Sequence, residues 1–80
     1  MELIYEYTHI PTGAELRLTM EEGRWRKGRY CYEFEYKQKP GYQFTTYKEH
    51  FSNVKYPYTI FKMWNQAVEA LPYVLNNKQN

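Results

Sequence analysis

The segment from Arg29 to Lys37 alternates aromatic side chains with charged or small ones, and this period of two constrains the fold more than any other feature. In an extended strand, one face would carry four aromatic residues: Tyr30, Tyr32, Phe34 and Tyr36. A helix would scatter the same residues around its axis. A strand with a wholly aromatic face needs a covering element, so we expect this face to form the core.

Residues 14–22 form the second predicted strand, because their apolar residues also alternate with polar ones. The alternative is a short helix, since Thr12 and Glu15 have the spacing of a capping box. A helix would turn Leu18 roughly 200° away from Leu16, whereas a strand keeps both on one face. We therefore favour the strand.

Two weaker strand signals flank these segments. Residues 2–10 contain β-branched and aromatic residues, although Ile4 falls on the wetter face, which an edge strand tolerates. Residues 42–46 continue in period two after the proline and glycine turn at 39–41. Residues 49–56 carry no clear signal, so a loop or a helical turn is expected there.

Near the C-terminus, apolar residues from Ile60 to Leu71 follow the three-to-four spacing of an amphipathic helix. Thr59 is the expected N-cap, and Pro72 should end or kink the helix. The polar tail at 76–80 is expected to fray. The sequence therefore predicts one α+β domain over residues 1–80, an antiparallel meander sheet of three or four strands packed by one C-terminal helix.

Length and composition narrow the environment of this domain. Eighty residues make one small domain, and 20% of them are aromatic, which supplies buried area that a short chain otherwise lacks. The single cysteine excludes an internal disulfide and fits a reducing compartment. Because no stretch has the roughly 20 apolar residues of a membrane span and the N-terminus is acidic, we expect a cytoplasmic protein without membrane contact.

The sequence offers little for catalysis. Cys31 and His50 are the one candidate pair of nucleophile and base, and such a dyad needs contact and a third, orienting group. His9 and His50 are too few for a closed zinc site, and the weaker alternative is a metal held by these two histidines and Glu49. We therefore expect no enzyme, no metal and no cofactor.

A basic loop is the strongest binding signal, with cations on both sides of an indole: Arg24, Trp25, Arg26, Lys27 and Arg29. This mixture binds phosphates by charge and can stack a base. The competing interpretation is an ordinary solvated hairpin tip, in which Glu21 and Glu22 neutralise part of the charge.

Tyr56 and Tyr58 flank Pro57, and aromatic residues on a rigid turn make good interface anchors. They could equally staple the start of the helix to the sheet. Both interpretations remain open at this point.

Two functions compete for this chain. The first is a non-enzymatic interaction module that binds, and by binding inhibits, a partner macromolecule, with another protein as the preferred partner. Judged by its length and its single sheet alone, such a module fits the anti-defence proteins of phages and mobile elements. The alternative is a nucleic-acid-binding domain that uses the basic hairpin and the sheet face left uncovered by the helix. Open edge strands also allow a homodimer.

Overall fold

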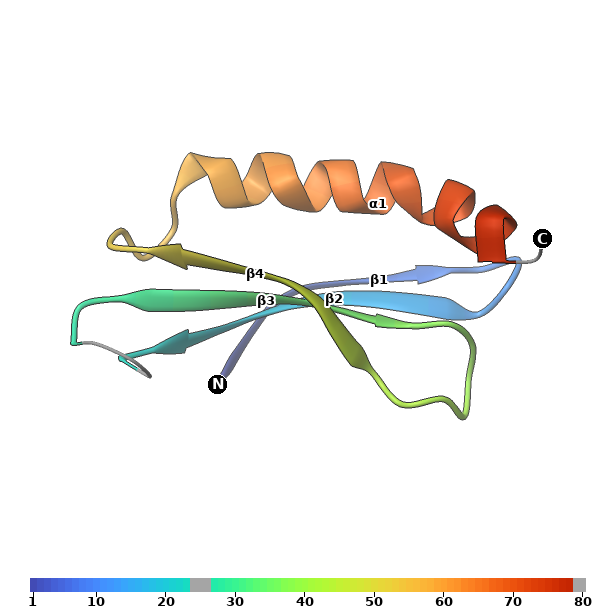
Figure 1. Ribbon diagram of the computed structural model, residues 1–80, viewed down its shortest axis with the longest axis horizontal. Coiled ribbons are helices and arrows are strands. Elements are labelled where there is room, and N and C mark those ends of the chain that lie inside the picture. Colours follow the sequence, from blue (N-terminus) through green and yellow to red (C-terminus); the bar gives the residue numbers. More distant parts are fainter. Residues whose placement is uncertain (24–26, 79–80) are drawn as a thin grey trace.

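The computed structural model describes residues 1–23 and 27–78, the side chains of 74–78 excepted. Within these residues four strands and one helix form two layers (Figure 1). The elements are β1 (Glu2–His9), β2 (Ala14–Glu22), β3 (Tyr30–Lys37), β4 (Thr45–Ser52) and α1 (Tyr58–Lys78). The strands pair antiparallel in the order β1-β2-β3-β4, which confirms the predicted α+β meander with its C-terminal helix.

The core lies between α1 and the aromatic row of β3, as the alternation predicted. Tyr32 and Phe34 are 0% and 1% exposed, and Trp64 packs in the same cluster. The other buried members of the cluster come from β2 and α1: Ala14, Leu16, Leu18, Met20, Ile60 and Leu71. Residues 14–22 are a strand, so the competing helix is excluded.

The first strand is an edge strand, but the expected exposure of Ile4 is wrong. The register shifts between Leu3 and Tyr5, which makes Ile4 the extra residue of a β-bulge. The bulge turns Ile4 back toward the helix, where it is half-buried against the core cluster. An imperfect alternation in the sequence was therefore the signature of a bulge.

The fourth strand lies later in the chain than the sequence predicted. β4 runs from Thr45 to Ser52, whereas residues 42–44 belong to the preceding loop. Phe44 lies under Arg17 on the sheet face opposite the helix, with the guanidinium 3.8 Å from the ring centroid. The period-two pattern of 42–46 thus came from a loop side chain that covers the sheet.

The helix also differs from the prediction at both ends. It begins at Tyr58, so Thr59 lies inside the first turn and is not the N-cap. The backbone amide of Ile60 donates to the carbonyl of Pro57 at 3.0 Å, which closes that turn. Pro72 does not end the helix, which continues to Lys78, although its last turns leave the line of the earlier ones in Figure 1. Residues 76–78 of the polar tail lie within this helix, and the fraying expected for 76–80 stays a prediction.

A close approach between two turns leads to the first prediction. Gly13 has a φ of 76°, and a Cβ there would lie 2.7 Å from Cδ of Pro40. Gly41 has a φ of 89°, but its Cβ would meet open space. We expect Gly13→Ala to lower the free energy of unfolding by more than about 1 kcal/mol, because strain and clash add.

Gly41→Ala is the matched control, since it carries only the conformational strain. Urea unfolding followed by tryptophan fluorescence measures both variants. Equal losses of stability would mean that the contact between Gly13 and Pro40 is unimportant.

Candidate functional site

A single helix leaves part of the sheet uncovered on the helix side. The outer two of four strands spaced about 4.8 Å apart lie about 14 Å from each other, whereas a helix with its side chains is about 10 Å wide. α1 lies over the β1 side, where Tyr5 stacks on Trp64 with 5.5 Å between ring centroids. The space beside α1, over β3 and β4, is a pocket of about 410 Å³.

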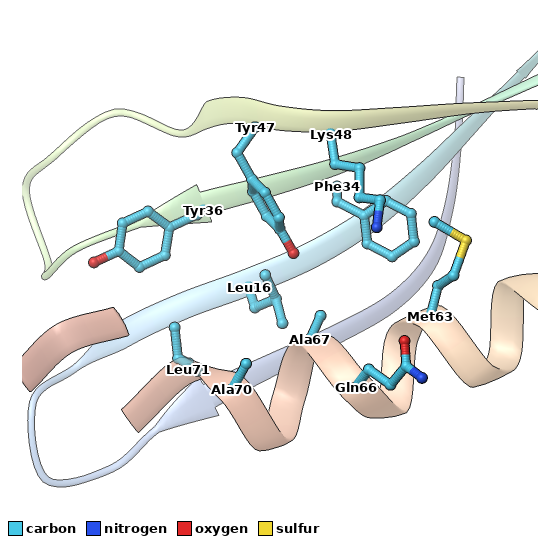
Figure 2. A pocket seen from close by; sticks show the side chains of 10 residues that line it. All are labelled: Leu16, Phe34, Tyr36, Tyr47, Lys48, Met63, Gln66, Ala67, Ala70 and Leu71. Atoms are coloured by element: carbon cyan, nitrogen blue, oxygen red, sulfur yellow. The ribbon is translucent and has the colours of Figure 1, made fainter. Parts of the chain in front are cut away.

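Figure 2 shows side chains from the sheet and from α1 around this pocket. Its walls are mostly core-type groups, with few polar ones among them. The lining residues are Leu16, Phe34, Tyr36, Tyr47 and Lys48 from the strands and Met63, Gln66, Ala67, Ala70 and Leu71 from the helix. We call this space the α1–β4 pocket.

A β-bulge in β4 places two consecutive side chains in the α1–β4 pocket. Phe34 pairs with Lys48 and Glu35 pairs with Thr46, which leaves Tyr47 as the extra residue. In a regular strand, Tyr47 and Lys48 would point to opposite faces, whereas both line this pocket. Sequence reasoning missed the pocket because it gave residues 49–56 no strand and ended the fourth strand before Tyr47.

The polar groups of the pocket are two phenols, one amide and one ammonium group. Burial raises the pKa of Tyr36 and of Tyr47 above the usual value, so both hydroxyls stay protonated at neutral pH. Lys48 is the one charged residue of the lining, and it has no ion-pair partner among the described residues. The pocket thus offers an apolar cavity, hydroxyl donors and one cation.

A second candidate surface lies on the segment that follows β4, between Val54 and Tyr58. Three large side chains of this segment are strongly exposed, with Val54 at 60%, Tyr56 at 47% and Tyr58 at 75%. We call these three residues the aromatic platform. Hydrogen bonds hold its loop, because the Ser52 hydroxyl both accepts from the Val54 amide at 3.0 Å and donates to the Val54 carbonyl at 2.9 Å.

Tyr56 is fixed by a contact far away in the sequence. Its hydroxyl donates to the Glu2 carboxylate at 2.8 Å, and this hydrogen bond raises the pKa of Tyr56. The structure therefore ties Tyr56 to β1 while almost half of its surface stays open. Tyr58 has no such hydrogen bond to the residues that the structure describes, and the cation of Lys62 lies 5.6 Å from its ring centroid.

The start of β3, which follows the predicted basic loop in the chain, and the loop between β4 and α1, which carries the aromatic platform, lie at the same end of the molecule (Figure 1). Tyr30 pairs with Ser52, so the start of β3, just after Arg29, adjoins the start of the platform loop. Arg29 lies over the ring of Phe51, 5.1 Å from its centroid, and Lys27 is exposed. Arg24, Trp25 and Arg26 fall outside the described residues.

The sheet face opposite the helix carries internal ion pairs at its centre. Arg17 contacts Glu35 at 3.0 Å, and Thr19 donates to the same carboxylate at 3.2 Å. Lys37 and Glu15 form a second pair at 2.6 Å. Because these charges are paired with one another, the middle of this face is less available for recognition than the sequence suggested.

Cys31 and His50, the candidate catalytic pair, do not meet. Cys31 pairs with Phe51 and Tyr32 pairs with His50, so the two side chains lie on opposite faces of the sheet. His9 is on the other edge strand, where its Nδ1 hydrogen-bonds the Thr12 hydroxyl at 2.8 Å. The structure therefore assembles neither the predicted dyad nor a histidine cluster.

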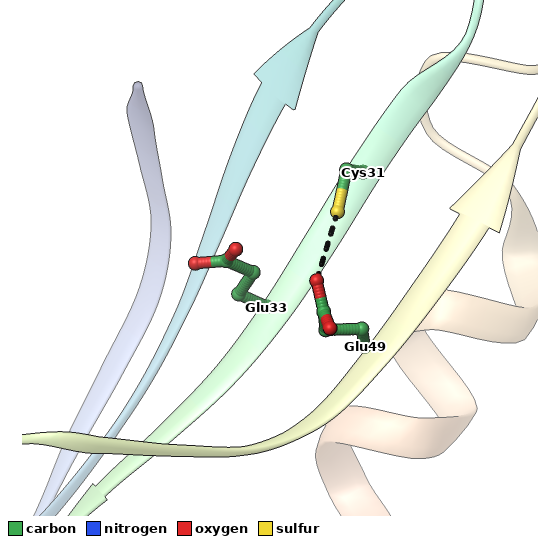
Figure 3. A group of neighbouring side chains, drawn as sticks. All are labelled: Cys31, Glu33 and Glu49. Carbon is green, nitrogen blue, oxygen red and sulfur yellow. Dashed lines mark hydrogen bonds between the residues drawn. The ribbon is translucent and has the colours of Figure 1, made fainter. Parts of the chain in front are cut away.

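Cys31 instead lies near two carboxylates, Glu33 and Glu49 (Figure 3). Its thiol donates to Glu49 at 3.7 Å, and the three potential ligand atoms lie within 4.8 Å of one another. A thiolate and two carboxylates could hold a divalent cation. Their proximity is also explained by the direct pairing of Glu33 with Glu49 and the hydrogen bond of the thiol, so we assign no metal to them.

Comparisons with protein-family models, with curated proteins and with solved structures gave no match for this chain. The described part of α1 is too polar to cross a lipid bilayer, and the described chain has no other helix.

Tyr32 leads to a prediction about pH. Burial raises the pKa of Tyr32 to about 12, and Tyr56, Glu2 and Tyr30 act in the same direction. Because this value lies above the usual 10.0, the protonated phenol stabilises the fold. We expect its contribution to be complete below pH 10 and to be lost as the pH rises to about 12. Urea unfolding at about pH 8 and about pH 11 measures this loss.

Tyr32→Phe is the control. The Tyr32 hydroxyl is buried and has no hydrogen-bond partner among the described residues, so its removal should cost little stability. The variant should also lose less stability between about pH 8 and about pH 11 than the parent, because only Tyr36, Tyr47 and Tyr56 still have a raised pKa. An unchanged loss would contradict this assignment.

Proposed function

We propose that this chain is a non-enzymatic interaction module that binds a partner protein through the aromatic platform. The observation that carries the proposal is the exposure of Val54, Tyr56 and Tyr58 on one hydrogen-bonded segment. Grouped exposed apolar residues are costly in water, and such groups commonly mark interfaces. Tyrosine is also among the residues enriched at interfaces, because its ring is apolar and its hydroxyl is polar.

Preorganisation supports this use of the platform. Binding costs free energy whenever flexible side chains must be ordered, and a loop that is already held avoids part of that cost. Here the turn at Ser52, the fixed φ of Pro57 and the bond from Tyr56 to Glu2 hold the backbone before a partner arrives. Binding here would cover the contact surface of the partner and keep the partner's other ligands from it, so binding alone could inhibit the partner.

The charges around the platform favour a partner with an acidic rim. Lys55 lies 5.6 Å from the centroid of the Tyr56 ring, and Lys62 lies at the same distance from the Tyr58 ring. Arg29 lies beside the start of the platform loop, because Tyr30 pairs with Ser52 and the Arg29 guanidinium is 5.1 Å from the Phe51 ring centroid. A positive rim raises the rate of association with a negatively charged surface.

Substitution of the platform tests the proposal. The double variant Val54→Ser with Tyr58→Ser should capture the partner from a lysate of the source cells at least about tenfold less well than the parent, since interface anchors each contribute more than about 1 kcal/mol. Quantitative mass spectrometry of the nuclease-treated, affinity-captured material measures this. Both side chains are exposed, so the fold should be retained, and a thermal melt checks it.

Tyr73→Ser is the matched control. Tyr73 is 71% exposed but lies near the other end of α1, so this variant should capture the partner as well as the parent does. Equal capture by the double variant and the parent would show that the platform is not the interface. A partner that is lost on nuclease treatment would instead favour nucleic acid.

Nucleic acid is the second candidate, and one observation favours it. Three cations at this end of the molecule lie beside aromatic rings, Arg29 at Phe51, Lys55 at Tyr56 and Lys62 at Tyr58. Rings and cations in alternation can stack bases and contact phosphates of a single strand.

The salt dependence of oligonucleotide binding tests the nucleic-acid alternative. The affinity for a single-stranded oligonucleotide should fall with salt, and each phosphate contact should contribute about 0.7 to the slope of log affinity against log salt. Replacing Lys27, Arg29 and Lys55 by alanine should flatten that slope by about 2, whereas Lys39→Ala, in the loop between β3 and β4, should leave it unchanged. Absence of binding at low salt would exclude the alternative.

A further inference from the structure

We propose that the α1–β4 pocket binds a small amphiphilic anion, a molecule with an apolar chain or ring and a terminal carboxylate. This site is separate from the aromatic platform, and the inference goes beyond the proposed interaction function. The apolar part would lie between α1 and the sheet, and the carboxylate would meet Lys48.

The size and the apolar walls of the pocket suit a small molecule. A volume of about 410 Å³ lies within the range of about 300 to 1,000 Å³ that is typical of small-molecule sites. The floor is formed by Leu16 and Phe34, which are 2% and 1% exposed and belong to the core. Met63 adds a flexible and polarisable wall, which adapts to irregular apolar ligands.

The bulge in β4 sets the direction of two polar side chains of the pocket. It turns Tyr47 and Lys48 toward the same side, although a regular strand would send one of them to the opposite face. Figure 2 shows both side chains reaching from β4 toward the side occupied by α1. Bulges of this kind commonly re-aim side chains at binding sites.

The charge of the pocket lining favours a ligand with a negative group. Lys48 is the one ionic residue of the lining and has no ion-pair partner among the described residues, although β4 also carries Glu49. Glu49 lies on the opposite sheet face, where it accepts from Cys31. The polar lining therefore suits a ligand with a single negative group, and a carboxylate would accept from Lys48 and from the Tyr47 hydroxyl.

Three probe molecules separate the contribution of the ligand's apolar chain from that of its negative charge. Sodium octanoate has both, 1-octanol has the chain alone and sodium acetate has the charge alone. Titrations followed by backbone amide NMR should show octanoate binding with a dissociation constant on the order of 1 mM or lower. The shifted resonances should include those of Phe34, Tyr47 and Ala67, because these residues line the pocket. Octanol should bind roughly tenfold more weakly, and acetate should not bind.

Two variants assign the effect to the pocket. Lys48→Gln should reduce octanoate affinity to that of octanol while leaving octanol affinity unchanged. Ala70→Trp should abolish binding of both, because Ala70 lines the pocket from an exposed position and a larger side chain there would fill it. Lys62→Gln, on the exposed side of α1 near the platform, is the control and should bind octanoate as the parent does.

Each alternative result would overturn the inference. Equal affinities for octanoate and octanol would remove the role of the charge, and shifts confined to residues outside the pocket would place the ligand elsewhere. Absence of binding by the folded parent at several millimolar octanoate would remove the site. None of these results bears on the aromatic platform, so the two proposals fail or survive separately.

Discussion

The single buried cluster that joins Ile60 and Trp64 of the helix to Tyr32 and Phe34 of the sheet is the feature on which the remaining structure depends. In a chain of 80 residues one helix must cover the aromatic face of the sheet, since no other helix is described. Aromatic side chains make this arrangement effective because each buries a large apolar area. The same arrangement cannot cover four strands completely, and the α1–β4 pocket is the space that remains beside the helix.

Two bulges adapt the sheet to this uneven cover. In β1, the bulge at Ile4 brings one more apolar residue under the helix, where α1 lies close. In β4, the bulge at Tyr47 brings a phenol and an ammonium group to the side where the helix leaves space. One edge of the sheet thus completes the core, and the other edge builds the wall of a pocket.

The many tyrosines have different roles because their hydroxyls meet different surroundings. Tyr32 lies wholly inside, and burial raises its pKa to about 12. Tyr47 lines the pocket, and Tyr56 is held by Glu2 at the rim of the sheet. Cations lie beside several exposed rings, which lets large apolar side chains remain at the surface with part of their faces occupied. The aromatic composition therefore serves the core and also two separate surfaces.

The sequence by itself determined the fold class, a meander of three or four strands, and the face of β3 that forms the core. These features follow from periodicity, and a period of two or of 3.6 residues sets which side chains share a face. The sequence did not determine the true extent of β4, the bulges at Ile4 and Tyr47, or the continuation of α1 beyond Pro72. Tertiary structure decided these, because pairing with β3 can extend a strand of polar residues, and an extra residue in a strand is recognisable only against its partner. The α1–β4 pocket likewise arises only when one helix is laid on a sheet wider than itself.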